Sequence, residues 1–295
     1  MSNQMDPGLL RRRSAQVTGI TCYEYLSSHS SKEGFPVIAL LTDFGTKDWF
    51  AASMKGAILS VDPSATIIDI THEIAAGDVR TGAFELLACF ADFPPGTVFV
   101  AVVDPGVGSE RGALAARAGD YCFVAPDNGL LSFVFNRFEK AEVHQIDNPA
   151  YAATDPCRTF HGRDVFGPVA AHLGKGVPLA KIGAPVETYV KLPWPQVFTS
   201  ENTIIGHVVY IDRFGNAVTS IESAAFSAKL KPGSCRVRAG EKEVPFRKFY
   251  REVKEGKPLA LWGSAGFLEI SINCGNAGSE LGLHIGDTVE IVMRR

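Results

Sequence analysis

The sequence lacks several features that mark common protein classes. It contains no apolar run of about 18 residues, which excludes an ordinary transmembrane helix. The formal net charge is only −3, so no basic surface favours binding to nucleic acid or to an anionic membrane. These absences favour a small-molecule ligand, and the hydrophobic fraction of 46% is typical of a globular protein.

Signatures of the common catalytic classes are also missing. There is neither the G-x-S-x-G turn of serine hydrolases nor the P-loop of nucleotide phosphohydrolases. The 7 histidines include no H-x-x-x-H pair and no Cys/His cluster, so no metal site is expected. The 6 cysteines form no C-x-x-C pair, and Cys89 and Cys122 lie in apolar runs. Reduced thiols in a cytoplasmic protein are therefore expected.

The first half of the chain predicts an α/β domain. Strands are expected at residues 37–41, 66–70 and 98–103. The first of these runs is wholly apolar, which is typical of a strand buried on both faces. A helix is expected from about Asp48, and a second near Asp78, which can cap it. Strands that alternate with helices favour a largely parallel sheet between helices.

The pattern then changes. Residues 113–117 and 121–125 predict a hairpin, and a short helix is expected at 164–173. Short β-like runs at 207–211, 235–238, 267–272 and 288–292 predict a small C-terminal β-barrel-like domain. The predicted organisation is a mobile N-terminal extension at residues 1–35, an α/β catalytic domain at 36–190, a proline-containing linker at 191–203 and the β domain at 204–295.

The segment Asp104-Pro-Gly-Val-Gly-Ser-Glu-Arg111 directly follows a predicted buried strand. Ligands of open α/β sheets bind beyond the carboxyl ends of the strands, so Asp104 lies where chemistry is expected. Gly106 and Gly108 do not fit a dinucleotide-binding loop, because position 111 is arginine and a strand follows instead of a helix. They either allow the backbone to approach a ligand or form a tight turn.

Further polar segments lie at the ends of predicted elements. Asp43, in Thr42-Asp43-Phe44-Gly45, can accept hydrogen bonds from a ribose diol or stabilise the next helix. His161 has polar, glycine-containing surroundings just before a helix that Asp164 can cap. In the predicted β domain, three polar loops are individually typical of turns. They span residues 212–216, 263–267 and 273–278.

Taken in order, five motifs resemble the S-adenosyl-L-methionine (SAM) hydroxide adenosyltransferase family, once a domain of unknown function and related to fluorinase and chlorinase. The resemblance runs from about residue 35 to the C-terminus, and five ordered motifs make chance agreement negligible. The motifs are T-D-F-G at 42–45, D-P-G-V-G at 104–108, P-D-N-G at 126–129, T-F-H-G-R-D at 159–164 and F-G-N at 214–216.

The resemblance implies a homotrimer whose active sites lie between the N-terminal domain of one subunit and the C-terminal domain of the next. It implies that Asp43 holds the ribose hydroxyls, while Asp212 and Ser264 hold the methionine amine and carboxylate. The remaining substrate contacts that it implies come from the β domain and lie near the adenine or the adjacent methionine part. They are Phe214, Asn216 and Asn273.

The catalytic positions distinguish the branches of the family. Asp104 stands where fluorinase has a tyrosine, and His161-Gly162 stand where it has a tyrosine and the halide-contacting serine. Asp104, Arg111 and His161 match the triad of the hydroxide branch, which implies hydrolysis of SAM to adenosine and L-methionine without a cofactor. Ala265 departs from the fluorinase pattern, which has an arginine there, so backbone N–H groups are expected to hold the carboxylate.

The chemistry suggests roles for the triad. The sulfonium is already a good leaving group, so the difficulty is water, whose pKa of about 15.7 leaves almost no hydroxide. Arg111 stays protonated and can orient Asp104, while Asp104 or His161 accepts the proton. The alternatives are a halide-dependent, chlorinase-like SAM lyase, a non-catalytic adenosine or SAM sensor, and a generic α/β phosphohydrolase.

Overall fold

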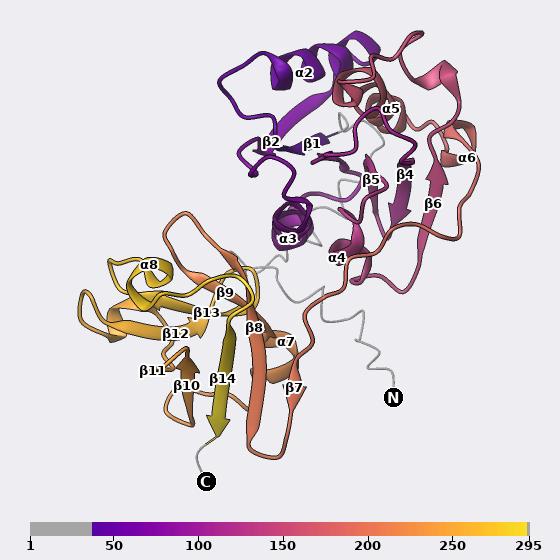
Figure 1. Cartoon of the computed structure of the whole chain (residues 1–295). Helices are drawn as coiled ribbons and strands as arrows, with labels where there is room; N and C mark the ends of the chain where they lie inside the picture. Colours follow the sequence, from indigo (N-terminus) through magenta and orange to yellow (C-terminus); the bar gives the residue numbers. More distant parts are fainter. Residues whose placement is uncertain (1–36, 294–295) are drawn as a thin grey trace, which may run out of the picture. The chain divides into compact units, whose positions relative to one another are not determined.

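The computed structural model describes residues 37–293, so the predicted N-terminal extension at 1–35 lies outside the described residues (Figure 1). The chain divides into two units, which separate in the sequence between Leu192 and Pro193. Each unit has its own sheet and its own buried apolar core.

The first unit contains a six-stranded sheet in the order β2-β1-β3-β5-β4-β6. The four strands β2, β1, β3 and β5 run parallel, whereas β4 is antiparallel to both of its neighbours. The predicted largely parallel sheet is thus confirmed, and β6 is an additional edge strand. The strands are β1 (Val37–Thr42), β2 (Thr66–Thr71), β3 (Val98–Val102), β4 (Ala113–Ala118), β5 (Tyr121–Pro126) and β6 (Ala141–Gln145).

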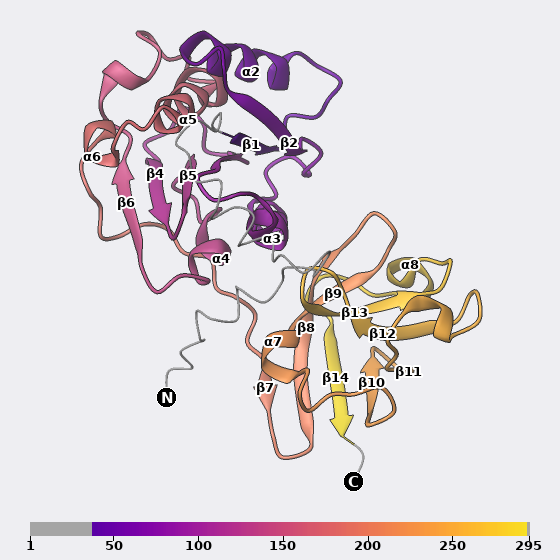
Figure 2. The same ribbon diagram turned by 180° about the vertical axis from the view of Figure 1, so that it is seen from behind.

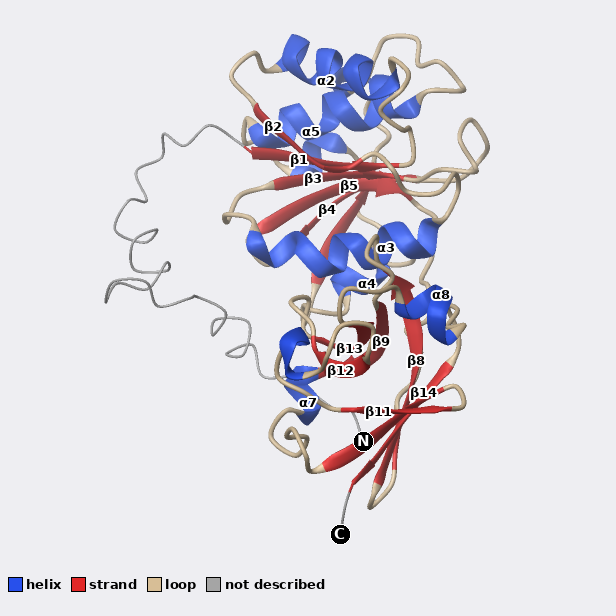
Figure 3. Cartoon of the chain, turned by 90° about the vertical axis from the view of Figure 1, so that its left-hand side faces the viewer, coloured by secondary structure: helices blue, strands red, loops and turns tan. Residues whose placement is uncertain are grey.

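Helices lie on both faces of this sheet (Figure 3). Met54 and Ile58 of α2 and Val169 of α5 belong to the core on one face, and α3 and α4 lie on the other. Asp78 caps α3 as predicted, because its carboxylate accepts the N–H of Thr81 at 3.0 Å. The helices are α2 (Phe50–Val61), α3 (Val79–Cys89), α4 (Ser132–Phe135), α5 (Gly167–Gly174) and α6 (Leu179–Ile182), with short 3₁₀ turns η2 (Phe90–Asp92) and η3 (Pro149–Tyr151).

The helix expected at residues 164–173 differs from the prediction. It begins with a π-helical turn, η4 (Gly162–Phe166), which continues into α5. The prediction that Asp164 caps this helix is wrong. Its carboxylate instead accepts the N–H of Cys157 at 2.8 Å and pairs with the adjacent Arg163, so it fastens the preceding loop. Isolated π-helical turns are often found at functional sites.

The second unit is an antiparallel sheet in the order β11-β10-β14-β8-β9-β13-β12, with β7 paired to β8 (Figure 2). An isolated bridge between Phe246 and Ala260 joins the two ends of the sheet, which makes it a nearly closed barrel, as predicted. The strands are β7 (Phe198–Thr199), β8 (Thr203–Ile211), β9 (Ala217–Glu222), β10 (Cys235–Ala239), β11 (Lys242–Pro245), β12 (Pro258–Trp262), β13 (Phe267–Ile272) and β14 (Thr288–Met293). The helical turns are α7 (Ser223–Phe226), η5 (Tyr250–Glu252) and α8 (Ala277–Leu281).

Candidate active site

Two acidic residues emerge at the same edge of the parallel sheet. Thr42 of β1 pairs with Val102 of β3, so Asp43 and Asp104 both follow the carboxyl ends of neighbouring strands. The carboxylate of Asp43 accepts the N–H of Gly77 at 2.8 Å. Burial raises the pKa of Asp43, and the charge of Asp104 raises it further, while the hydrogen bond from Gly77 opposes this rise. The two carboxylates are therefore close enough to influence each other.

Arg111 joins Asp104 and His161 into one cluster. Its Nε donates to Oδ1 of Asp104 at 3.0 Å, while its Nη2 donates to Oδ2 of Asp104 and to Nδ1 of His161, the latter at 2.8 Å. Its Nη1 donates to the carbonyl of Gly112 at 3.1 Å, and the guanidinium lies 5.3 Å from the ring centre of Phe166. Arg111 thus contacts both of the other predicted catalytic residues, although the three come from two separate loops.

The cluster is largely withdrawn from solvent, with the side chains of Asp104 and Arg111 only 5% and 11% exposed. Burial lowers the pKa of His161, and the positive charge of Arg111 lowers it further, against the opposing charges of Asp104 and Asp164. A guanidinium can only donate, so Nδ1 of His161 must accept its hydrogen bond. The imidazole is therefore neutral and carries its proton on Nε2.

Two glycines let the loops of this cluster fit together. A Cβ on Gly108 would lie 2.2 Å from the carbonyl oxygen of Arg158, and Gly108 has a φ of +75°. A Cβ on Gly162 would lie 2.8 Å from the ring of Phe44. The segment that leads to and contains His161 therefore packs directly against the motifs that contain Phe44 and Gly108.

His72 holds the turn that carries Asp43. Its Nδ1 lies 2.8 Å from the hydroxyl of Thr42, and its carbonyl accepts the N–H of Gly45 at 2.7 Å. Its Nε2 lies 3.1 Å from the carboxylate of Asp69. Thr42 and His72 are both buried, so these contacts are positioning contacts and not a nucleophilic triad. No sequence pattern marked His72, because a lone histidine beside a strand is usually structural.

The predicted substrate-binding residues of the second unit lie in the turns between strands. The carboxylate of Asp212 accepts the N–H groups of Phe214 and Asn216 at 2.9 and 2.8 Å, and also the side-chain amide of Asn216 at 2.8 Å. Phe214 is 75% exposed, whereas Asn216 is buried. Ser264 is exposed between β12 and β13. Asn273 is buried, and its amide donates to a main-chain carbonyl at 2.9 Å.

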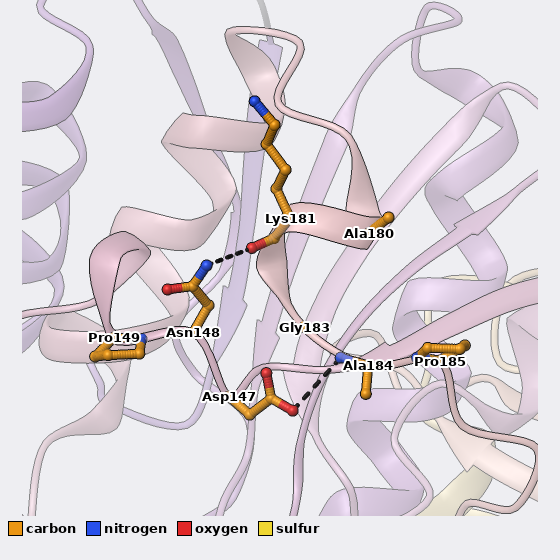
Figure 4. A pocket seen from close by; sticks show the side chains of 8 residues that line it. All are labelled: Asp147, Asn148, Pro149, Ala180, Lys181, Gly183, Ala184 and Pro185. Carbon is orange, nitrogen blue, oxygen red and sulfur yellow. Dashed lines mark hydrogen bonds between the residues drawn. The ribbon is translucent and has the colours of Figure 1, made fainter.

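A cavity of about 510 Å³ lies in the first unit and includes none of these residues. The amide of Asn148 donates to the carbonyl of Lys181 at 2.7 Å, and Asp147 accepts the N–H of Ala184 at 3.4 Å (Figure 4). These polar groups brace two segments of the wall against each other. The cavity is lined by Asp147, Asn148, Pro149, Ala180, Lys181, Gly183, Ala184 and Pro185.

Other kinds of site have no support in the described range. Residues 37–293 contain no group of three or more His, Cys, Asp or Glu side chains that could hold a metal ion. None of the helices in this range combines the length and the apolar character needed to cross a membrane. Cys89, Cys122, Cys157 and Cys274 are free thiols.

Together the fold and the site define a class of protein. An α/β unit carries a half-buried carboxylate–guanidinium–imidazole cluster at its strand ends, and an antiparallel barrel follows it in the sequence. Such a cluster is suited to polarising a water molecule. The chain belongs to the SAM hydroxide adenosyltransferase family. The family's N-terminal domain matches residues 38–183, and its C-terminal domain matches residues 206–290.

Known proteins resemble the chain over most of its length. It is 38% identical to the (R)-S-adenosyl-L-methionine hydrolase of Thermus thermophilus, over 86% of this chain and 99% of that protein. A fluorinase of Nocardia brasiliensis is 28% identical, over 87% of this chain and 96% of that one. The crystal structure of an uncharacterized conserved protein from Thermotoga maritima matches with a TM-score of 0.82 and 40% identity, over 86% of this chain and 99% of that one.

Proposed function

We propose that this chain hydrolyses (R)-S-adenosyl-L-methionine to adenosine and L-methionine. The observation that carries the proposal is the contact of Asp104, Arg111 and His161 beside Asp43 at the strand ends. Family membership and the hydrolases to which the chain is similar supply the substrate. The sulfur of the sulfonium is stereogenic, and the names of these relatives specify its (R) form.

The reaction is a displacement at the 5′ carbon of the ribose. The water oxygen forms a bond to this carbon as the carbon–sulfur bond breaks, and the electron pair of that bond leaves with methionine as a neutral thioether. One proton of the water must be removed as its oxygen becomes the 5′ hydroxyl of adenosine. The positive charge of Arg111 stabilises the hydroxide character that develops on the attacking oxygen.

In this proposal Asp104 accepts the proton. Nδ1 of His161 already accepts a hydrogen bond from Arg111, so its Nε2 carries a proton and can only donate. His161 therefore holds the water oxygen, and a carboxylate oxygen of Asp104 takes the proton. Both oxygens of Asp104 are held by the guanidinium, so the acceptor is fixed in place before the reaction begins.

The substrate contacts follow the family resemblance. Asp43 holds the ribose hydroxyls, and the β-domain residues hold the methionine and adenine parts. The protein is a homotrimer in this proposal, and each active site is formed by the N-domain of one subunit and the C-domain of the next. Co-assembly of an Asp104→Ala chain with an Asp212→Ala chain tests this arrangement. Partial recovery of activity in mixed trimers is expected, whereas none would contradict sites shared between subunits. The β-domain residues are Asp212, Phe214, Asn216, Ser264 and Asn273.

The proposed reaction requires no cofactor, since water and the sulfonium are the only reactants. A cytoplasmic location fits the free thiols of Cys89, Cys122, Cys157 and Cys274, because thiols stay reduced there.

The decisive experiment is chromatography of the purified protein incubated separately with (R)- and (S)-SAM, with and without chloride or fluoride. We expect adenosine and methionine in equal amounts from the (R) form, independent of halide, and no product with His161→Ala. A 5′-halogenated adenosine would instead identify a halide-dependent lyase. Tight binding of adenosine or SAM without turnover would identify a sensor, in which Asp104, Arg111 and His161 only contact the ligand.

A further inference from the structure

The P-D-N-G motif at residues 126–129 has no role in the proposed mechanism, although it is one of the five motifs on which the family resemblance rests. It begins at the carboxyl end of β5, which lies beside β3 in the sheet. The two strands are parallel, so their carboxyl ends meet at the same edge. The motif therefore lies beside the strand end that carries Asp104, the proposed proton acceptor.

Asn128 connects these two strands beyond the point where their ladder stops. The register of β3 with β5 ends at Val100 of β3. Pro126, the last residue of β5, has no N–H with which to continue it. Further along, the side-chain amide of Asn128 donates to the carbonyl of Val103 at 2.8 Å. Val103 directly precedes Asp104, so this hydrogen bond fixes the main chain from which the carboxylate extends.

The amide of Asn128 is itself held in position. Its Oδ1 accepts the N–H of Leu130 at 3.2 Å, so both polar atoms of the amide are engaged. Leu130 and Val103 are fully buried, so the amide joins two segments that are already fixed by packing. A catalytic group is held accurately only when the residues that support it are themselves locked. Asn128 meets this condition for the segment that leads to Asp104.

The same motif reaches Arg111 by a second route. The N–H of Asp127 donates to the carbonyl of Gly112 at 2.9 Å. This carbonyl also accepts a hydrogen bond from Nη1 of Arg111 at 3.1 Å. A Cβ on Gly112 would lie 3.2 Å from the Cβ of Asp127, so the two segments are in close contact. Two consecutive residues of the motif thus hold the main chain beside each member of the carboxylate–guanidinium pair.

We propose that Asn128 is a positioning residue for the hydrolysis and acts on Asp104 through the carbonyl of Val103. The inference deepens the proposed function and rests on it. Arg111 bonds both oxygens of Asp104, so a shift of the main chain at Val103 disturbs both of these bonds. The shift then reaches His161 through Nη2 of Arg111. A displacement of about 1 Å in such a site can lower the rate about a hundredfold.

Asn148 provides a matched control with the same two kinds of hydrogen bond. Its amide donates to the carbonyl of Lys181 at 2.7 Å (Figure 4). Its Oδ1 accepts the N–H of Ala150, two residues further along, at 3.0 Å. Both asparagines lie in the first unit and both are half-buried. Asn148, however, braces the wall of a cavity that includes none of the proposed catalytic residues.

The test measures kcat and KM for SAM in Asn128→Leu and Asn148→Leu of the full chain. Leucine matches the shape of asparagine but neither donates nor accepts a hydrogen bond. We expect kcat of Asn128→Leu to fall about 10- to 100-fold with KM within about twofold, and Asn148→Leu to change neither value more than about twofold. KM should be retained because Asn128 is not a proposed substrate contact. Asn128→Ser should show the same loss of kcat, since its hydroxyl can still accept the N–H of Leu130 but is too short to reach Val103.

Nitrogen NMR of protein with isotope-labelled histidine tests the positioning without turnover. In the wild type the two ring nitrogens of His161 should give well-separated signals at neutral pH, because Arg111 fixes the tautomer that carries its proton on Nε2. The two signals should approach each other in both Asn128 variants, as the tautomers begin to exchange, and stay in place in Asn148→Leu. His161→Ala assigns the signals.

Unchanged kcat and unchanged nitrogen signals in the Asn128 variants would overturn the inference. Equal losses of kcat in Asn128→Leu and Asn148→Leu would overturn it as well, because they would show a general effect on the fold. A rise of KM with wild-type kcat would make Asn128 a substrate contact instead. Should Asn128→Leu fail to fold, Asn128→Ser alone decides. If the wild type does not hydrolyse SAM, the proposed function fails and the nitrogen signals alone decide the positioning role.

Discussion

Arg111→Lys should strongly reduce turnover although it preserves the positive charge. The guanidinium makes two bonds to Asp104, one to His161 and one to the carbonyl of Gly112, from nitrogens fixed in one plane. An ammonium group donates from a single point, so it cannot bridge both oxygens of Asp104 and reach the imidazole at once. Loss of the bridge leaves His161 and Asp104 without a shared anchor.

The expected size of the effect follows from the interactions that lysine cannot make. One charge-assisted hydrogen bond contributes about 1.5–3 kcal/mol, and the contact with the Phe166 ring at 5.3 Å about 0.5–1 kcal/mol. If these act in the transition state, the sum of about 2–4 kcal/mol lowers kcat roughly 30- to 1,000-fold. KM should change little, because Arg111 is not a predicted substrate contact. Arg111→Ala is less informative, since it would leave the buried carboxylate of Asp104 unpaired, at a cost to stability of about 3–5 kcal/mol.

Arg163 provides a matched control. Its guanidinium also holds a carboxylate with two bonds, at 2.5 and 2.8 Å to Asp164, and it also lies 5.3 Å from a phenylalanine ring, that of Phe160. Its side chain is 43% exposed and it has no bond to Asp104 or His161, so Arg163→Lys should lower kcat less than about threefold.

The assay is steady-state formation of adenosine, measured by chromatography, with thermal unfolding followed for each variant. Wild-type kcat in Arg111→Lys would refute the assigned role of the guanidinium. Equal losses in the two lysine variants would show that the energies assigned to these interactions are wrong, because the geometry of the two pairs is alike, whereas their neighbours and their exposure to solvent differ.

Three further predictions concern the residues around the cluster. Burial and the adjacent guanidinium lower the pKa of His161, so kcat/KM should be constant through neutral pH and fall only below about pH 6.5. The fall is expected because a protonated Nδ1 can no longer accept the hydrogen bond from Arg111. A pH–rate profile that stays constant down to about pH 4 would contradict this. Gly108→Ala should lower kcat about tenfold or more, since its Cβ would strike the carbonyl of Arg158, and wild-type kinetics would show that this fit is unimportant. Thr42→Val loses the hydrogen bond to His72, so it should lower the free energy of unfolding by about 1–3 kcal/mol and raise KM. Thr42→Ser keeps the hydroxyl and should retain the wild-type values of both. Equal denaturation curves and equal KM values for the two variants would contradict this reasoning.

The α/β unit was predictable wherever burial leaves a simple pattern. Strands buried on both faces are continuous apolar runs, so β1 and β3 were found to within a residue or two. The start of α3 was fixed by a capping aspartate, Asp78. Strand β6 was not predicted, because it is an edge strand with polar residues at most positions, and only its pairing with β4 defines it. Its place depends on a partner distant in the sequence.

The candidate site was predictable in its residues but not in its contacts. Strand ends indicated Asp43 and Asp104, and the family resemblance indicated Arg111 and His161. Nothing local indicates that His161 accepts a hydrogen bond from Arg111, since that depends on how two loops 50 residues apart close on each other. The same holds for Asp164, which local pattern assigned to a helix cap and which instead binds a loop N–H.

The glycines of the motifs have a different meaning from the one their sequence pattern suggests. Glycines in the loop after β3 are compatible with close approach of a ligand, yet the close neighbour of Gly108 is the carbonyl of Arg158, from the loop that leads to His161. Gly162 is likewise close to Phe44. These small residues bring the loops near enough for a 2.8 Å contact between Arg111 and His161. The D-P-G-V-G and F-H-G-R-D segments therefore pack as one unit, and a larger side chain in place of a glycine in either segment should disturb the same hydrogen bond. Such a change should slow the reaction, because a displacement of about 1 Å can lower the rate a hundredfold.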